Sequence, residues 1–409
     1  MHDMDVGRQW ACALAGAAAL TISSSATAAP ITAEQALARA AEASPLLLAA
    51  QAGATAAEAR ARQAGVSPNP ELEIELEDAL GTGPYRGFRG AELTLAFGQK
   101  FERGGKRAAR QALASAEIDL AQGNLDRAKA DLARDVRMAF ADHLAARELA
   151  RLASEAALRA EELARTARLL VETGRDPPLR QMRAEASLAQ ARAEEQRLAA
   201  EAQQAGRALA FLIGAPDDEG LEPLASPGLA PEPVSVPETR SIGIRIAEAE
   251  RRMAEARVGV EHAAAIPDIT ARAGVRGHAE SDDIAVVGGF SLPLNLRGQN
   301  RGAIDAARAE LLGAEARLAQ ARLDAIREDR SARSQLAAAD ARVSALEGAG
   351  LGQAREAVRV ARIGYAAGRF TLLEVLDAQA ALNTTLSAIV EARRDRERAL
   401  AAVARAQAR

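Results

Sequence analysis

The sequence predicts a mainly helical protein with a small β portion, built from one structural unit that occurs twice. Its composition is the first observation: 48% of the 409 residues are hydrophobic and 26% are charged, but only 2% are aromatic. Such a composition is typical of long helices rather than of a compact mixed core. The second is the order helix, strand, strand, long helix, helix, which is found twice. The third is an unbroken helical pattern of 67 residues in each copy, over 105–171 and 300–366, which corresponds to about 100 Å of helix.

The N-terminal residues 1–28 have the features of a secretory signal peptide. Arg8 supplies a positive charge, and a short apolar run over 10–22 follows it. Ala26 and Ala28 then form an Ala-x-Ala cleavage site. The apolar run is too short to span a bilayer as a helix. We therefore expect the chain to be exported.

The single cysteine of the chain, Cys12, lies inside this apolar run. Gln9 stands where a lipobox would have leucine, so no lipid anchor is expected. The exported chain would then contain no disulfide and no reactive thiolate. The net charge of -4 is spread along the sequence and leaves no basic surface of the kind that binds nucleic acid.

The first copy of the unit covers residues 29–213. It begins with a short helix over 33–43 and a second helix that a Ser-Pro pair starts. The segments ELEIELE and ELTLAF alternate between polar and apolar residues, which predicts strands at about 70–78 and 91–100. A helical hairpin over about 105–213 completes the copy, with a glycine and two prolines at its turn.

The second copy covers residues 241–409 and follows a linker at 214–240 that contains six prolines. It begins with a helix and continues with strands predicted at about 267–276 and 284–293. A second helical hairpin is predicted over about 300–408. Because element order, strand pairs and turn glycines all coincide, we interpret the two halves as a repeat.

The strand lengths point to a membrane. Nine or ten residues are about what a tilted transmembrane β-strand needs. Four strands cannot close a barrel, and lipid does not tolerate an open sheet edge, so three copies with twelve strands are the smallest assembly expected to leave a pore. Leu72, Ile74 and Leu76 would then face lipid, while Glu73 and Glu75 would face the lumen. The alternative is a soluble coiled coil capped by two hairpins.

Several segments resemble the outer-membrane factor family, the TolC-like channels. They are the signal peptide, the duplicated long hairpin and the stretches SPNPELEIEL, FGQKFERGGKR and YAAGRFTLLEVLDAQ. The resemblance covers essentially the whole exported chain, and the GGKR variant is similar to the heavy-metal branch of the family. It implies a homotrimer with a twelve-stranded outer-membrane β-barrel, four strands per chain, above a long periplasmic α-barrel. The proline-rich linker would lie in an equatorial collar.

The same resemblance implies a function and partners. The expected function is the exit duct of a tripartite efflux system, with heavy-metal cations as cargo. The expected partners are a periplasmic adaptor (a membrane fusion protein) and an inner-membrane pump of the resistance-nodulation-division type. Two alternatives to this function remain open. One is an outer-membrane channel for drug efflux or type I secretion, and the other is a soluble periplasmic adaptor or coiled-coil scaffold.

Two glycine corners stand at matching positions, 194 residues apart, and their residues are Gly174, Arg175, Gly368 and Arg369. Glycine permits the backbone conformation that a tight helix reversal needs. The resemblance implies that both corners are periplasmic tips at which the adaptor docks.

The expected periplasmic gate lies next to the second corner. Glu374 and Asp377 are three residues apart and share one helix face. In TolC-like channels, acidic residues at the matching positions of the second repeat ring the periplasmic constriction. Arg180 and Arg183 hold the equivalent positions of the first repeat, and we expect them to pair with these acids on neighbouring hairpins.

No residue pattern predicts an enzyme, a metal centre or a cofactor site. The three histidines of the exported chain are His143, His262 and His278, and they fall in unrelated elements. Neither their spacing nor that of the scattered methionines matches a ligand set. Cations would therefore pass without dedicated coordination by this chain.

Overall fold

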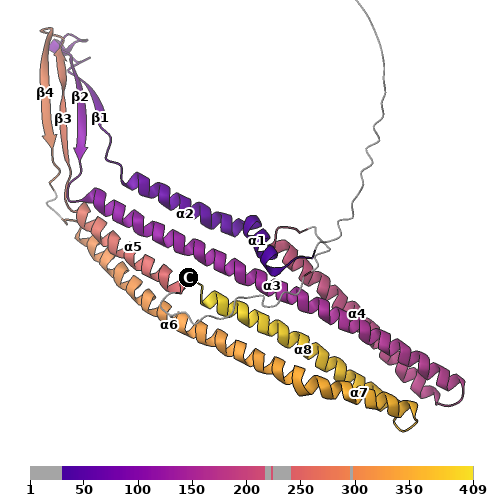
Figure 1. The fold of residues 1–409 in the computed structure, drawn as a ribbon. Helices are drawn as coiled ribbons and strands as arrows, with labels where there is room; N and C mark the ends of the chain where they lie inside the picture. Colours follow the sequence, from indigo (N-terminus) through magenta and orange to yellow (C-terminus); the bar gives the residue numbers. More distant parts are fainter. Residues whose placement is uncertain (1–29, 217–222, 224–240, 295–297, 409) are drawn as a thin grey trace, which may run out of the picture.

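A computed structural model describes residues 30–216, 223, 241–294 and 298–408 (Figure 1). The expected signal peptide lies outside these ranges, as does nearly all of the expected linker. The elements of the first half are α1 (Ala33–Ala43), α2 (Pro45–Ala64), β1 (Glu71–Glu77), β2 (Glu92–Phe101), α3 (Lys106–Glu172) and α4 (Pro178–Leu212). Those of the second half are α5 (Ile242–Ala264), β3 (Ile269–His278), β4 (Asp283–Ser291), α6 (Arg301–Ala345), α7 (Leu351–Ala366) and α8 (Leu372–Ala406).

The helices run along an elongated body with the sheet at one end and both hairpin turns at the other (Figure 1). The helix α3 has 67 residues, about 100 Å at 1.5 Å per residue. It packs against α2 near the sheet and against α4 near the turn, while α6 packs in the same way against α5 and then α8. The expected mainly helical chain with four short strands is confirmed.

The four strands form one antiparallel sheet in the order β1-β2-β3-β4. The two inner strands come from different repeats, and Leu95 lies opposite Val275 where they pair. The outer strands β1 and β4 each have one partner within the chain. The other edge of each outer strand therefore has backbone groups that are not paired with any described strand.

The second long helix departs from expectation. We expected unbroken helix over 300–366, but α6 and α7 are separated by a π-helical turn at Leu346–Gly350. Gly348 lies inside this turn with φ -72° and ψ -108°, outside the helical region. Glycine destabilises a helix interior because it leaves the backbone its greatest freedom, and Gly348, Gly350 and Gly352 fall within five residues. The matching stretch of α3 contains no glycine, and α3 is continuous.

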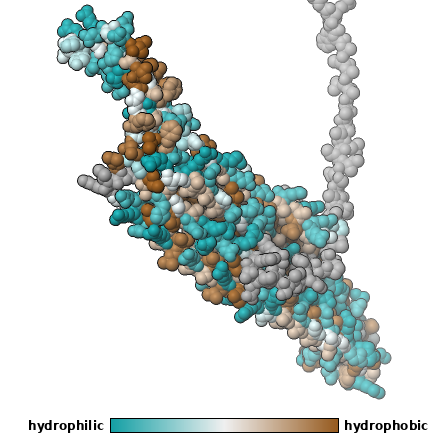
Figure 2. All heavy atoms as spheres, turned by 60° about the vertical axis from the view of Figure 1, so that its left-hand side comes forward, coloured by the Kyte–Doolittle hydropathy of each residue, from teal (hydrophilic) through white to brown (hydrophobic). Residues whose placement is uncertain are grey.

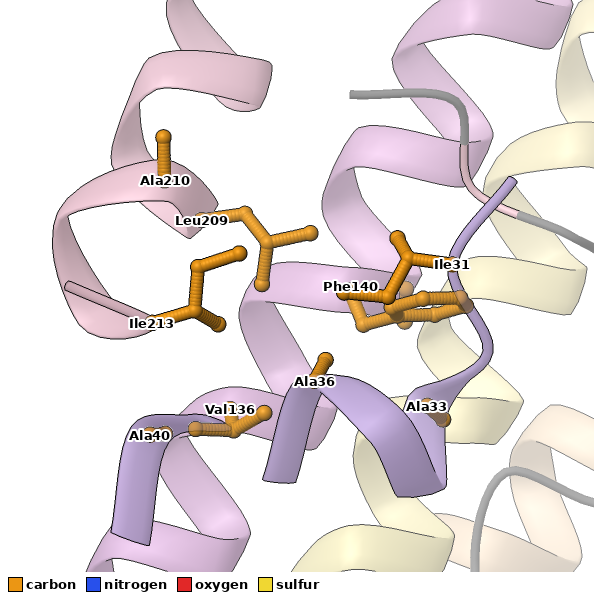
Figure 3. Close-up of a cluster of buried hydrophobic side chains, with 10 residues drawn as sticks. Ile31, Ala33, Ala36, Ala40, Val136, Phe140, Leu209, Ala210 and Ile213 are labelled. Atoms are coloured by element: carbon orange, nitrogen blue, oxygen red, sulfur yellow. The ribbon is translucent and has the colours of Figure 1, made fainter. Parts of the chain in front are cut away.

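A buried cluster joins the N-terminal segment to the first hairpin (Figure 3). Val136 and Phe140 of α3 pack there with Leu209 of α4 and with Ile213, which follows α4, and Ile31 packs beside Phe140. All five side chains are almost completely buried. This cluster lies about midway along α3 and fixes the position of the first hairpin relative to the chain that precedes it.

Candidate channel-forming sheet and helical tips

The sheet has one apolar face. Opposite residues in an antiparallel pair lie on the same face, so the registers place Ile74, Leu95, Val275 and Val286 in one row across all four strands. Ile74 is 66% exposed and Val286 is 86% exposed. The exposed apolar residues of this face are Leu72, Ile74, Leu76, Leu93, Leu95, Phe97, Val275, Ile284, Val286 and Phe290. Apolar residues gather along the sheet between its hydrophilic outer end and the helices (Figure 2).

The opposite face of the sheet is charged. Arg272 of β3 lies 2.9 Å from a carboxylate oxygen of Glu73 on β1. Arg276 lies 2.8 Å from both Glu77 and Glu92. The pairs that Glu73 and Glu77 form with these arginines reach across β2, and all three pairs help to hold the two hairpins of the sheet together. Successive side chains of a strand point to opposite faces. The glutamates of β1, including Glu75, therefore lie on the charged face, opposite to Leu72, Ile74 and Leu76.

Phenylalanines mark the helix end of the apolar face. Three exposed phenylalanines lie close together at this end: Phe101 and Phe97 on β2, four residues apart, and Phe290 on β4, which the register places level with the residue midway between them. Tyr85 and Phe88 are exposed in the loop at the opposite end. Phe101 and Leu93, eight residues apart, bound a band about 27 Å long along the strand. At the strand tilt of about 35–45° in outer-membrane barrels, this length spans a height of about 19–22 Å, a little less than the apolar band of about 25 Å that aromatic residues flank there.

The first hairpin reverses at Gly174 through a Schellman motif. The Arg175 amide donates to the Leu170 carbonyl at 2.8 Å, and the Gly174 amide donates to that of Val171 at 3.0 Å. Gly174 has φ +69°, a left-handed conformation that glycine adopts without a steric cost. The side chain of Arg175 is left exposed at the end of the molecule.

The second hairpin reverses with the same hydrogen bonds. The Arg369 amide donates to the Gly364 carbonyl at 2.8 Å, and the Gly368 amide donates to that of Tyr365 at 3.0 Å. Gly368 has φ +71°. The ring of Phe370 packs so closely on Gly364 that a Cβ there would lie 2.1 Å from it. The two corners are thus equivalent in backbone, and only the second is held by an aromatic ring.

A contact that the sequence did not reveal links the two tips. The Tyr365 hydroxyl donates to Asp176 Oδ2 at 3.2 Å, and Arg180 also binds Asp176. The side chain of Asp176 is only 7% exposed. Burial and this neighbouring carboxylate raise the pKa of Tyr365 above its ordinary value. Ala167, Ala184 and Leu372 are buried beside this cluster, so the two hairpins of one chain are packed together at their ends.

The expected gate residues fall into two groups. Glu374 closes a capping box on α8, because its carboxylate accepts from the Thr371 amide at 2.5 Å and its own amide donates to Thr371 Oγ1 at 3.4 Å. Asp377 is exposed on the same helix, one turn further on. Both carboxylates lie in the first two turns of α8, next to the second tip.

Within one chain, the described residues show no ion pair between the two arginines and these acids. Arg180 pairs with Asp176, which lies one helical turn before it, and not with Glu374 or Asp377. Arg183 is exposed and makes no ion pair within the described ranges. Pairing of Arg180 and Arg183 with the acids of a neighbouring chain stays a prediction.

The tyrosine hydroxyl is expected to help hold the tips closed. A net contribution of about 0.5–1.5 kcal/mol is usual for such a bond. Tyr365→Phe removes the hydrogen bond but keeps the ring, so it should increase the conductance of purified protein in planar bilayers. Tyr85→Phe, in the loop at the far end of the sheet, is the matched control. Equal conductance in the two variants would show that this bond does not hold the tips.

The described residues contain no group of three histidine, cysteine, aspartate or glutamate side chains that could hold a metal ion. His143 is buried, and its ring lies against Gly206 where α3 and α4 approach closely. None of the helices in these ranges is both long and apolar enough to cross a membrane.

An amphipathic sheet with open edges, joined to two long helical hairpins, defines a class of channel-forming protein. The model of the outer membrane efflux protein family matches residues 36–215 and 238–409, and the chain belongs to this family. The resemblance to TolC-like outer-membrane factors is therefore confirmed. The outer membrane protein VceC of Vibrio cholerae has the same fold, with a TM-score of 0.76 and 23% identity over 92% of this chain and 96% of VceC.

Curated relatives carry the names of metal resistance proteins. The nickel-cobalt-cadmium resistance protein NccC of Alcaligenes xylosoxydans xylosoxydans is 35% identical over 251 residues, 60% of this chain. The match spans only 57% of NccC. The cobalt-zinc-cadmium resistance protein CzcC of Cupriavidus metallidurans is 31% identical over 287 residues, 69% of this chain and 68% of CzcC.

Proposed function

We propose that three copies of this chain form the outer-membrane exit duct of a tripartite efflux system for heavy-metal cations. The observation that carries the proposal is the four-stranded sheet with an exposed apolar face, a charged face and two edges that no described strand covers. An open edge is not tolerated in lipid. Pairing β1 of one copy with β4 of the next closes a barrel of twelve strands, with Leu72, Ile74 and Leu76 toward lipid.

The soluble-scaffold reading fits this sheet poorly. A scaffold would leave the whole apolar face in water, and apolar patches of this extent usually mark a protein or membrane contact. It would also leave two strand edges open to aggregation. Insertion into the outer membrane removes both problems at once.

The cargo is proposed from the relatives and from the charged face. NccC and CzcC are named for resistance to nickel, cobalt, cadmium and zinc. On the face that would line the pore, β1 alone carries Glu71, Glu73, Glu75 and Glu77. Only part of this charge is balanced by Arg272 and Arg276. A lumen with excess carboxylate favours cations over anions.

The partners are a periplasmic adaptor and an inner-membrane pump of the resistance-nodulation-division type. The adaptor would dock at the exposed corners formed by Gly174, Arg175, Gly368 and Arg369. Cargo and partners are tested together in a host lacking its own outer-membrane factors, supplied with a metal pump and adaptor. We expect the chain to raise tolerance to nickel, cobalt or cadmium. Higher tolerance to drugs alone, with a drug pump, would favour the drug-efflux reading.

Docking at the tips predicts a sharp difference between two substitutions at one position. Gly368→Val is expected to abolish efflux, because a β-branched residue cannot hold φ near +71°. Gly368→Asn should keep efflux, since asparagine adopts the left-handed region. Both variants should still form trimers in the outer membrane. Unimpaired efflux and adaptor cross-linking in Gly368→Val would remove this corner from the docking site.

A further inference from the structure

Exposed arginines surround the base of the sheet, where the strands give way to the long helices. Arg103 follows the end of β2, and Arg107 and Arg301 lie at the starts of α3 and α6. Arg107 and Arg301 are 194 residues apart, so they hold equivalent positions in the two repeats. In a trimer this pair would recur three times, giving six equivalent arginines at one level beneath the apolar band.

The carboxylates near these arginines already have other partners. Arg110 binds Glu102 and thereby holds the pKa of that carboxyl below its ordinary value. Burial alone would raise the pKa of Asp268, but hydrogen bonds from Lys106, the Arg103 amide and Lys100 outweigh it and lower the pKa. Lys106 lies 2.7 Å and Lys100 lies 3.2 Å from Asp268.

The three arginines are consequently available to an external anion. Arg107 reaches only the hydroxyl of Ser67, at 3.4 Å. Neither Arg103, Arg107 nor Arg301 forms a side-chain ion pair with another residue in the described part of the chain. Guanidinium groups bind phosphate through paired N–H donors, and they do so more specifically than ammonium groups.

Apolar side chains are exposed at the same level. Phe101 is the last residue of β2 and is 55% exposed, and Leu294 beyond β4 is 70% exposed. Ile266 and Leu292 add further exposed apolar surface. Arginines directly beside such side chains match the boundary where phospholipid headgroups meet acyl chains. A ring of them at one level fits a lipid leaflet better than it fits a single soluble anion.

We propose that Arg103, Arg107 and Arg301 bind the headgroup phosphates of anionic phospholipids in the leaflet on the helical side of the barrel. The proposal rests on the proposed function, because it takes the apolar face of the sheet to lie in the membrane. The trimer would thus recruit anionic phospholipid around its base. An attraction of about 1 kcal/mol per basic residue near a charged lipid surface corresponds to about fivefold enrichment for each arginine.

The test measures which lipids remain bound to the trimer. Full-length exported protein is reconstituted in vesicles of phosphatidylcholine with one fifth phosphatidylglycerol, and native mass spectrometry counts the lipids that stay attached. We expect phosphatidylglycerol to be enriched at least about fivefold over its share of the vesicle. The variant Arg103→Gln/Arg107→Gln/Arg301→Gln should lose most of this enrichment. The control Arg165→Gln/Arg317→Gln/Arg327→Gln, on helix surfaces away from the sheet, should retain it.

Three results would overturn the proposal: no enrichment in the wild type, equal enrichment in the two triple variants, or equal retention of lipid A when it replaces phosphatidylglycerol. The last would assign the site to the other leaflet. Failure of the proposed function looks different, because the protein would then form no trimers and carbonate would extract it from the vesicles. Inserted trimers that conduct ions without selecting anionic lipid would defeat the lipid proposal alone.

Discussion

Placing arginine at Ile74 is expected to prevent most of the chain from appearing as trimers in the outer membrane. Ile74 lies in the middle of the apolar row and is 66% exposed. A charged residue on the lipid face near the bilayer midplane costs about 2–4 kcal/mol, and each trimer carries three copies. This is roughly a 30- to 1,000-fold loss in the equilibrium for inserting each chain.

The neighbouring position supplies the matched control. Glu75→Arg introduces the same side chain one residue away, on the charged face of the sheet. It should leave trimer yield nearly unchanged and reduce the preference of the pore for cations. Trimer yield is measured on unheated gels of isolated outer membranes, and selectivity from the reversal potential in planar bilayers. Equal yields for the two arginine variants would contradict a lipid-facing role for Leu72, Ile74 and Leu76.

Neutralising the acids next to the second tip is expected to have the second large effect. In a trimer, Glu374 and Asp377 would present two stacked rings of three carboxylates at the periplasmic entrance. The double variant Glu374→Gln/Asp377→Asn should raise single-channel conductance or lower cation preference, and it should weaken block by multivalent cations added on the periplasmic side. Glutamine is chosen at 374 because it preserves the capping box with Thr371.

Two further variants separate the charge from the structure. Glu374→Ala removes the bond from the N3 side chain to the Thr371 amide as well as the charge, so it should also destabilise the first turn of α8. Glu356→Gln neutralises an exposed glutamate of α7 whose partner is Arg359 on the same helix, and it should leave conduction unchanged. If conductance, selectivity and block all stay the same in the double variant, these two acids do not form the gate.

Local patterns predicted most of the fold, because they depend on few neighbours. The alternation in ELEIELE specified both β1 and the face on which Ile74 lies, since strand side chains alternate strictly. The glycines at 174 and 368 specified two helix reversals, because only a left-handed residue closes a Schellman motif cheaply. Each of the two 67-residue patterns predicted a continuous long helix. The prediction is correct for the first, which is α3, and wrong for the second, which a π-helical turn interrupts.

What the sequence did not predict depends on distant contacts or on several small effects combined. Tyr365 and Asp176 are 189 residues apart, and no local pattern indicates that two reversals pack side by side. The π-helical turn falls where three glycines stand within five residues, each of which a helix would tolerate by itself. The partner of Arg180 within one chain was not predicted either: it is Asp176, four residues earlier and just before α4 begins.

The most direct test of the central claim, a barrel closed by three copies, is a cross-link between the two open edges of the sheet. Cys12 is the only cysteine and lies in the expected signal peptide, so introduced cysteines would be unique in the exported protein. One cysteine is placed on β1 at Leu72, Ile74 or Leu76, and another on β4 at Ile284 or Val286, in all combinations. For at least one combination, oxidation in intact outer membranes should yield disulfide-linked dimers and trimers and nothing larger. Monomers in every combination, or a ladder extending beyond the trimer, would contradict the closed twelve-stranded barrel.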